Sequence, residues 1–306
     1  MNEPADEILK ASCGQYNLDH KKAKLVRNHH NYVYECEDKF LKITGANFRS
    51  YDEIANQIYF TEQLSRNGIK VVETISTTSG QSCVEIKGAA RSFTAMCFRK
   101  ITGRKFGKED LNRDHFRRMG KFVGKLHSTA NSMKLEASFR KWDEIFINDS
   151  AEFLPEKANI RALYERLYAE LKTYSEDGKV FGMIHYDFHS GNYLIDQQGD
   201  IVLFDFELSC RSWYANEIGV ILFWIRRLEK IEKRDELERF FLSEFWQGYE
   251  SEFEMRQDEK RKIYKFALFR GIQVYGYLEQ QFPGNEKVAR LKETILESIH
   301  LLSRKI

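Results

Sequence analysis

The stretch from residue 183 to residue 207 constrains the fold of this chain most, because two short apolar runs in it flank a polar link. The runs are Tyr193 to Ile195 and Ile201 to Phe204, and the link between them contains Gly199. Apolar runs separated by a few residues that include glycine are typical of a β-hairpin. We therefore expect two short antiparallel strands here, joined by a tight turn.

Two polar residues lie at the open end of this hairpin, and a third lies on the loop that precedes it. A turn centred between Gln198 and Gly199 places Asn192 opposite Asp205, and Asp187 lies five residues upstream of Asn192. Carboxylate and amide oxygens are hard ligands that hold Mg²⁺ together with nucleotide phosphates. The pattern predicts a metal site at Asn192 and Asp205, with Asp187 left free as a base.

The same residues carry a resemblance to a known family. The run His185-Tyr186-Asp187-Phe188-His189-Ser190-Gly191-Asn192 resembles the H-x-D-x-x-x-x-N catalytic loop of the aminoglycoside phosphotransferase and choline kinase group, the small-molecule relatives of protein kinases. Asp205-Phe206-Glu207 is similar to the metal-binding D-x-D/E motif of that group. The group usually has glycine where this chain has Tyr186.

The resemblance implies a role for each residue of the two motifs. Asp187 would orient the acceptor hydroxyl and accept its proton, and His185 would brace the catalytic loop. Asn192 and Asp205 would ligate Mg²⁺, with Glu207 assisting the metal.

It also implies an α+β, two-lobed, protein-kinase-like fold. We expect an antiparallel sheet lobe at residues 1–98 that binds nucleotide, and a mainly helical lobe at residues 99–306 that carries catalysis and acceptor binding. The implied reaction is phosphorylation of a small-molecule hydroxyl by ATP and Mg²⁺, with an aminoglycoside, choline, homoserine or a sugar-like compound as acceptor. We expect the acceptor pocket between a helical insertion at 131–178 and the C-terminal helices, near Trp142, Trp213 or Trp246.

Residues 24 to 44 predict two successive hairpins with a lysine on the last strand. Lys42 alternates with Leu41 and Ile43, so it shares a strand face with Phe40. The resemblance implies that Lys42 contacts the nucleotide phosphates.

No glycine-rich G-x-G-x-x-G sequence precedes this lysine. Asn31-Tyr32-Val33-Tyr34 is instead similar to the N-x-V-Y hairpin of the group, which implies a nucleotide-binding role for Asn31. Backbone amides of residues 28 to 31 are candidates for contact with phosphate oxygens.

A helix is predicted at residues 50 to 67, where apolar residues recur at helical spacing and Gly68 follows as a C-terminal cap. Kinase-like folds need an acid on this helix to orient the strand lysine, and Glu53 is our choice. The family pattern, counted back from Gly68, permits Gln57 at that place instead, which would remove the ion pair. Further along, the segment 98–103 resembles the linker between lobes, with backbone groups near Met96 and Phe98 as the partners of adenine.

Three other functions compete with the small-molecule kinase. A protein Ser/Thr kinase of the same fold is disfavoured because no A-P-E follows Asp205 and the chain has only three prolines. A noncatalytic nucleotide-binding pseudokinase is disfavoured by the intact Lys42, Asp187, Asn192 and Asp205. A metallohydrolase could use His185, Asp187 and His189, since histidine and carboxylate ligands suit Zn²⁺.

Composition and charge restrict the kinds of binding partner that we expect for the protein and the cellular compartment in which we expect it. The net charge of +2 gives no electrostatic case for nucleic acid. Five scattered cysteines without a C-x-x-C indicate reduced thiols. The N-terminus lacks the features of a signal peptide, and no apolar run approaches the ~20 residues of a membrane helix. We therefore expect a cytoplasmic protein that acts neither on nucleic acid nor at a membrane, and the sequence leaves its oligomeric state open.

Overall fold

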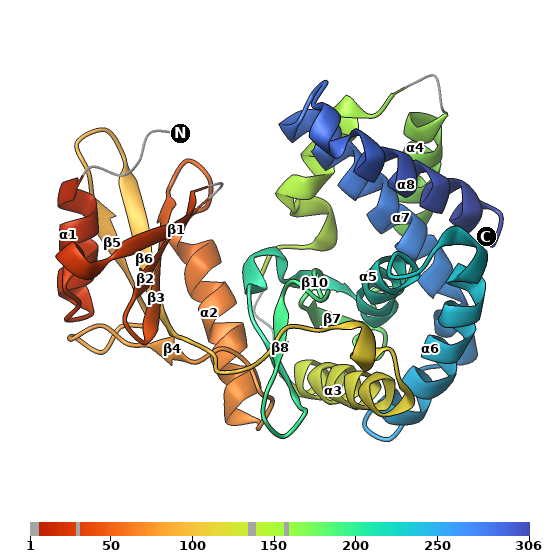
Figure 1. The fold of residues 1–306 in the computed structure, drawn as a ribbon, viewed down its shortest axis with the longest axis horizontal. Helices are drawn as coiled ribbons and strands as arrows, with labels where there is room; N and C mark the ends of the chain where they lie inside the picture. Colours follow the sequence, from red (N-terminus) through yellow and green to blue (C-terminus); the bar gives the residue numbers. More distant parts are fainter. Residues whose placement is uncertain (1–5, 29–30, 134–138, 156–158) are drawn as a thin grey trace. The chain divides into compact units, whose positions relative to one another are not determined.

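The computed structural model describes residues 6–28, 31–133, 139–155 and 159–306 (Figure 1). The chain divides into two compact units. The first unit comprises Met1–Lys105 and Leu194–Glu207, and the second comprises Phe106–Tyr193 and Leu208–Ile306.

The first unit contains a sheet and two α-helices, and the second is mainly helical. The α-helices are α1 (Asp6–Gln15), α2 (Tyr51–Arg66), α3 (Arg113–Ser132), α4 (Ile160–Leu171), α5 (Tyr214–Arg226), α6 (Arg234–Tyr249), α7 (Gln257–Gln281) and α8 (Glu286–Ser303). The strands are β1 (Lys24–Asn28), β2 (Tyr32–Cys36), β3 (Lys39–Gly45), β4 (Thr74–Ile75), β5 (Cys83–Lys87), β6 (Ser92–Arg99), β7 (Phe181–Ile184), β8 (Tyr193–Ile195), β9 (Ile201–Leu203) and β10 (Cys210–Trp213). Short 3₁₀ helices include η3 (Trp142–Glu144) and η4 (Phe146–Phe153) in the predicted insertion.

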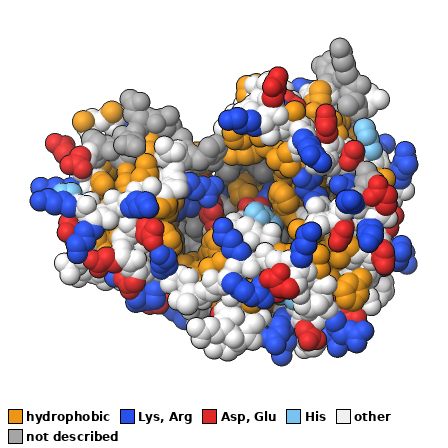
Figure 2. Space-filling model, in the orientation of Figure 1, with side chains coloured by type: hydrophobic (Ala, Val, Ile, Leu, Met, Phe, Trp, Pro, Cys, Tyr) orange, Lys and Arg blue, Asp and Glu red, His pale blue; other side chains and the backbone are white. Residues whose placement is uncertain are grey.

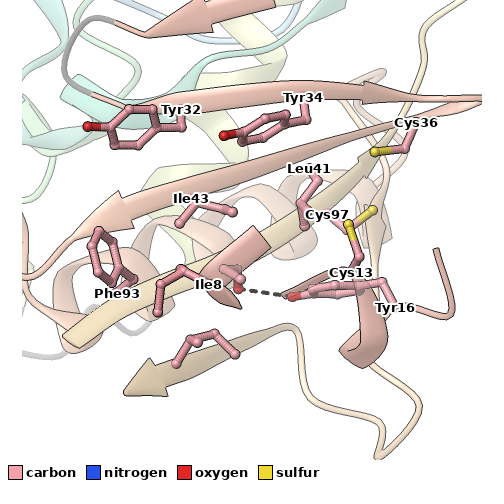
Figure 3. Close-up of a cluster of buried hydrophobic side chains, with 12 residues drawn as sticks. Ile8, Cys13, Tyr16, Tyr32, Tyr34, Cys36, Leu41, Ile43, Phe93 and Cys97 are labelled. Carbon is pink, nitrogen blue, oxygen red and sulfur yellow. Dashed lines mark hydrogen bonds between the residues drawn. The ribbon is translucent and has the colours of Figure 1, made fainter. Parts of the chain in front are cut away.

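The sheet of the first unit has the order β1-β2-β3-β6-β4, and β5 also pairs with β6. All of its pairings are antiparallel. One face packs on α1, where Ile8 and Cys13 join Leu41, Ile43 and Cys97 in a buried cluster (Figure 3). The hydroxyl of Tyr16 donates to the carbonyl of Ala95 at 2.9 Å within this cluster.

The other face of the sheet packs on α2. Ile54 and Ile58 of α2 form a second buried cluster with Cys83 and Met96. Because successive side chains of a strand point to opposite faces, the apolar residues that flank Lys42 face α1 and leave Lys42 on the α2 side. This places Lys42 as the alternation in the sequence predicted.

The hairpin β8–β9 belongs to the first unit because backbone hydrogen bonds join it to that sheet's connections. Arg104 and Ile195 exchange N–H···O bonds of 2.9 and 2.8 Å, and the amide of Val72 donates to the carbonyl of Leu203 at 2.9 Å. The boundary between the units therefore follows Lys105 rather than residue 98, and fourteen residues from the middle of the chain return to the first unit.

The register predicted for this hairpin is wrong by one residue. The amide of Asp196 donates to the carbonyl of Asp200 at 2.9 Å, so the loop between them has three residues and ends at Gly199. Gly199 has φ +79°, the left-handed conformation that closes a three-residue hairpin loop. The extra loop residue shifts the pairing away from a turn centred between Gln198 and Gly199.

The second unit is built from closely packed helices around the short β7–β10 ladder. A Cβ at Gly248 of α6 would lie 1.9 Å from the carbonyl oxygen of Arg117 of α3, so only glycine permits this helix crossing. Helix α5 is buried on nearly every side and packs along α7. The core of this unit thus fixes α5 and α7 beside each other.

The predicted α+β class is confirmed, with one strand-rich and one helical unit. Helix α1 was missed, because residues 1 to 22 have too few apolar residues for a clear helical pattern. All five cysteines are free and buried. None of the described helices combines the length and apolarity that a membrane span requires. On the face in Figure 2, basic and acidic side chains are interspersed.

Candidate active site

A cavity of about 520 Å³ lies within the first unit. Its apolar walls come from the sheet, from the segment after β6 and from the β8–β9 hairpin, and include Val26, Val33, Phe40, Phe98, Ile101, Leu194 and Phe204. Lys42 and Asp205 supply charged groups to the same wall. A cavity of this size with a few convergent polar groups is typical of a small-molecule or cofactor site.

Lys42 binds the two carboxylates of the predicted metal motif. Its ammonium lies 2.8 Å from Oε2 of Glu207 and 3.3 Å from Oδ1 of Asp205. Burial alone would lower the pKa of Lys42, but the two carboxylates outweigh it and raise the pKa. Burial would raise the pKa of Glu207, but Lys42 and Arg49 lower it to about 2. The three side chains therefore form a charged cluster.

Asp205 is held in an uncommon backbone conformation. Its φ is +60°, in the left-handed region that costs a residue with a side chain about 1–3 kcal/mol. The next residue, Phe206, is buried and packs edge-on against Phe60 of α2, with ring centroids 5.9 Å apart. The packing of Phe206 on Phe60 therefore holds the strained backbone of Asp205, and with it the carboxylate, at the cavity wall.

Asn31 supports Glu207 from the sheet. Its side-chain nitrogen donates to Oε2 of Glu207 at 2.7 Å, and its oxygen accepts from the hydroxyl of Thr44 at 2.6 Å. Asn31 also lines the cavity. The neighbouring His29 and His30, from the predicted phosphate-binding loop, lie outside the described residues.

The structure separates Glu53 from Lys42. Glu53 completes the capping box of α2, where its carboxylate accepts from the amide of Ser50 at 2.8 Å. Gln57, one turn later, is buried, lines the cavity and accepts from the guanidinium of Arg49 at 2.7 Å. The prediction that Glu53 pairs with Lys42 is thus wrong, because the Glu53 carboxylate bonds to Ser50 at the N-terminus of α2. The carboxylates that pair with Lys42 are those of Asp205 and Glu207.

Met96 and Phe98 were predicted to lie beside adenine, and only the side chain of Phe98 lines the cavity. Phe98 lines the cavity with the segment that follows it. Met96 pairs with Lys42 across the strands, but its side chain is buried beneath α2 with Ile54 and Ile58. The side chain of Met96 therefore contributes to the core, and any contact with a nucleotide base would fall to its backbone.

The second unit contains the predicted catalytic loop between β7 and β8. The amide nitrogen of Asn192 donates to Oδ2 of Asp187 at 2.9 Å and to its carbonyl at 3.0 Å. This orientation leaves the amide oxygen of Asn192 as the atom that could ligate a metal. The ring of His185 accepts from the amide of Asp187 at 3.2 Å, and the ring of His189 accepts from the amide of Gly191 at 3.0 Å. Both histidines therefore brace the backbone of the loop.

Arg270 of α7 is a partner of Asp187 that the sequence did not reveal. Arg270 is 2% exposed, and its guanidinium pairs with Oδ1 of Asp187 and lies 5.4 Å from the ring centroid of Tyr186. Burial would raise the pKa of Asp187, but Arg270 and His189 lower it to about 2. The sequence pattern of α7 does not distinguish Arg270 from the other charged residues of the helix, because its partner Asp187 lies far away in the chain.

Tyr186 replaces the glycine that is usual at this place, and it has the backbone conformation of a glycine. Its φ is +66°. Glu217 of α5 holds the strained segment by accepting from the amides of His185 at 2.5 Å and Tyr186 at 3.1 Å. The Tyr186 hydroxyl bonds to the side chain of Gln273, one turn after Arg270. Glu217 therefore supports the catalytic loop from α5.

Two of the tryptophans proposed for the acceptor pocket are core residues. Trp142 and Trp213 are fully buried, and their rings pack against each other with centroids 5.2 Å apart. Trp246 packs on Phe245 and Tyr249 and lies 4.7 Å from the ammonium of Lys260. Trp142 and Trp213 therefore belong to the core of the second unit.

The comparisons with known proteins agree with this geometry. Residues 23–257 match the model of the phosphotransferase enzyme family, so the chain belongs to that family. It is 27% identical to the amicoumacin kinase of Bacillus subtilis (strain 168) over 292 residues, which are 92% of this chain and 86% of that protein. The resemblance to the aminoglycoside phosphotransferase and choline kinase group is thereby confirmed.

Two solved structures have the same fold. The amicoumacin kinase hAmiN, in complex with AMP-PNP, Ca²⁺ and Ami, has a TM-score of 0.88 at 24% identity and covers 96% of this chain and 92% of its own. The microcompartment-associated aminopropanol kinase has a TM-score of 0.78 at 19% identity, with 97% and 96% covered.

Proposed function

We propose that this protein transfers the γ-phosphoryl group of ATP to a hydroxyl of a small molecule, with Mg²⁺ as the metal. The observation that carries the proposal is the ion-paired group of Lys42, Asp205 and Glu207, of which Lys42 and Asp205 line the 520 Å³ cavity. A cation and a pair of hard carboxylates are the parts that phosphoryl transfer requires around a nucleotide and its metal. The family to which the chain belongs supports the same reaction.

The first unit would bind the nucleotide. Phe40, Phe98 and Phe204 provide apolar surface for the base, and Lys42 is placed to contact phosphate oxygens. Asp205 and Glu207, with the amide oxygen of Asn192, would hold Mg²⁺, which neutralises the charge that develops on the transferred group when it is bound. The triphosphate would then replace the carboxylates as the partner of Lys42.

The second unit would bind the acceptor. Asp187 has Asn192 and His189 at Oδ2 and Arg270 at Oδ1, so the remaining lone pair of Oδ1 is left for the acceptor hydroxyl. A carboxyl with a pKa of about 2 is a weak base. In a loose transition state the nucleophile gains little from early proton loss. Asp187 would therefore act mainly by orienting the hydroxyl, and it would take the proton late.

The test is a screen for acceptor-dependent ADP release at fixed MgATP. The panel holds amino alcohols, aminoglycosides, sugars and amicoumacin, since relatives are named for amicoumacin and aminopropanol, and a serine-containing peptide for the protein-kinase alternative. A turnover that depends on one acceptor and disappears in Asp187→Asn is the expected result. If only a peptide substrate is phosphorylated, the protein-kinase alternative holds, and MgATP binding without any turnover would favour the pseudokinase.

A further inference from the structure

A second cavity, of about 210 Å³, lies within the second unit between the catalytic loop and α5. We call it the α5 cavity. The loop contributes Phe188, His189 and Ser190, and α5 contributes Ile221, Trp224 and Ile225. The α5 residues recur at positions three and four apart, so they form one face of the helix.

The α5 cavity and Asp187 share one side chain. Nε2 of His189 lies 3.5 Å from Oδ2 of Asp187, and the same imidazole packs on Trp224 with ring centroids 4.9 Å apart. One imidazole therefore separates the proposed base from the cavity. A small molecule with its hydroxyl at Asp187 needs to extend only past His189 to place its next group in this cavity.

The lining of the α5 cavity selects the chemistry of that group. It consists mainly of aromatic and aliphatic side chains, has no carboxylate among its described residues and has one cationic side chain, Arg227. Burial and the nearby Arg234 lower the pKa of Arg227 to about 10, which leaves it charged at neutral pH. An ammonium group placed here would have no counter-ion and would meet a like charge.

The size of the cavity matches one ring. An apolar cavity of about 150 Å³ is large enough to bind benzene. At about 210 Å³ the α5 cavity has room for a ring and a short substituent, but not for several linked sugars. An apolar group that fills the cavity is removed from water, which favours its binding.

We infer that the acceptor is an alcohol with a ring-sized aromatic or apolar group, which the α5 cavity binds while the hydroxyl lies at Asp187. This inference rests on the proposed function, because it assigns the acceptor of that reaction. It separates the protein from kinases whose acceptors are polycationic sugars. Trp224 and Leu228 then act as specificity-determining residues.

The binding test uses benzyl alcohol as the probe and needs no turnover. The chain has four tryptophans, and Trp224 lines the α5 cavity, so the ring current of an aromatic probe bound there shifts its indole N–H resonance. Benzyl alcohol should shift the Trp224 resonance and leave those of Trp142 and Trp213 unchanged. Ethanolamine, which lacks a ring, should shift none. A Trp224 resonance that does not respond to benzyl alcohol would overturn the inference.

A matched pair of variants locates the binding. Leu228 lines the cavity and is 36% exposed, whereas Leu291 on α8 is 38% exposed and lies outside it. Leu228→Trp should weaken benzyl alcohol binding at least about tenfold, a change of ~1.4 kcal/mol. Leu291→Trp should leave it unchanged, and equal affinities in the two variants would place the probe elsewhere. Both positions are exposed enough to accept the larger side chain without loss of the fold.

Turnover distinguishes failure of this inference from failure of the proposed function. Ring-bearing alcohols should give ADP release that Leu228→Trp reduces, while the Leu291→Trp enzyme matches the wild type. Turnover with an aminoglycoside that is unaffected by Leu228→Trp would confirm the proposed function and refute the ring-binding role. Absence of ADP release with every alcohol, despite a shifted Trp224 resonance, would refute the proposed function and with it the assignment of the ring to an acceptor, while ring binding in the α5 cavity would stand.

Discussion

Arg270 of α7 pairs with Asp187 of the catalytic loop, although 83 residues separate them in the chain. The arginine has no other ion pair among the described residues, and two of its nitrogens lack a hydrogen-bond partner. A buried cation with a single carboxylate as its partner is costly to leave alone. The pair therefore links the stability of the helical unit to the position of its reactive carboxylate.

Arg270→Met should destabilise the protein by about 2 kcal/mol, below the ~3–5 kcal/mol of a fully buried broken pair because Asp187 keeps Asn192 and His189. Combining it with Asp187→Asn should recover part of that loss, since the unpaired carboxylate is then removed. Chemical denaturation of the wild type, both single variants and the double variant gives the coupling energy. Strictly additive effects would show that the pair contributes nothing.

Asp187→Asn should lower stability, because it leaves the buried Arg270 without its carboxylate partner, but it should keep the fold and MgATP affinity nearly intact while it lowers turnover by ~10²–10⁴, the range for a lost positioned base. Asparagine keeps the size and one acceptor oxygen, but it cannot take the proton. Acceptor-dependent ADP release and MgATP titration on the same preparations measure both effects. Retention of more than about a tenth of wild-type turnover would contradict the role of Asp187.

Asp205→Asn should act differently, by weakening Mg²⁺ and nucleotide together. The substitution removes a negative ligand from the proposed metal site and a partner from Lys42. Calorimetric titration of ATP at several Mg²⁺ concentrations would show a steeper metal dependence in the variant. Identical binding isotherms for variant and wild type would remove Asp205 from the metal site.

Lys42→Ala should weaken ATP binding, whereas Glu53→Gln should not. Lys42 lines the cavity of the first unit, while Glu53 holds the N-terminus of α2, where a capping contact contributes ~1 kcal/mol of stability. Calorimetry and thermal unfolding on both variants separate the two roles. A loss of ATP affinity in Glu53→Gln equal to that in Lys42→Ala would restore the pairing of these residues.

Glu217 should make stability depend on pH. Burial raises its pKa from 4.5 to about 7. Between these values the folded protein binds a proton that the unfolded chain has released, so the free energy of unfolding falls as pH rises through this window. Glu217→Gln should lose this dependence, a difference of ~2–3 kcal/mol between the two ends of the window. Denaturant titrations from pH 5 to 8 test this, and parallel curves for variant and wild type would refute it.

The sequence predicted what depends on local pattern. Alternation placed Lys42 on its strand face, and motif spacing identified Asp187, Asn192, Asp205 and Glu207. The strand face predicted for Lys42 agrees with the structure, because a strand fixes side-chain direction with a period of two. The roles of Asp187, Asn192, Asp205 and Glu207 stay predictions. The family and the fold class followed from them.

What the sequence did not predict depends on packing between distant segments. Arg270 is one of many charged residues in the C-terminal helices, and only the crossing of α7 with the catalytic loop makes it special. Glu53 and Gln57 lie one turn apart on α2, so the choice between them required the position of the sheet. The hairpin register failed because a single left-handed glycine lengthened the loop.

The return of residues 194–207 to the first unit also sets the order in which this protein can fold during synthesis. The first 105 residues emerge from the ribosome without the hairpin that supplies Asp205 and Glu207. About 100 further residues must be made before that unit is complete, although N-terminal domains usually fold first. Until then the backbone amide of Val72 and the backbone carbonyl of Lys70 lack their hydrogen-bond partner, Leu203. A fragment that ends at Lys105 would therefore remain incomplete at equilibrium.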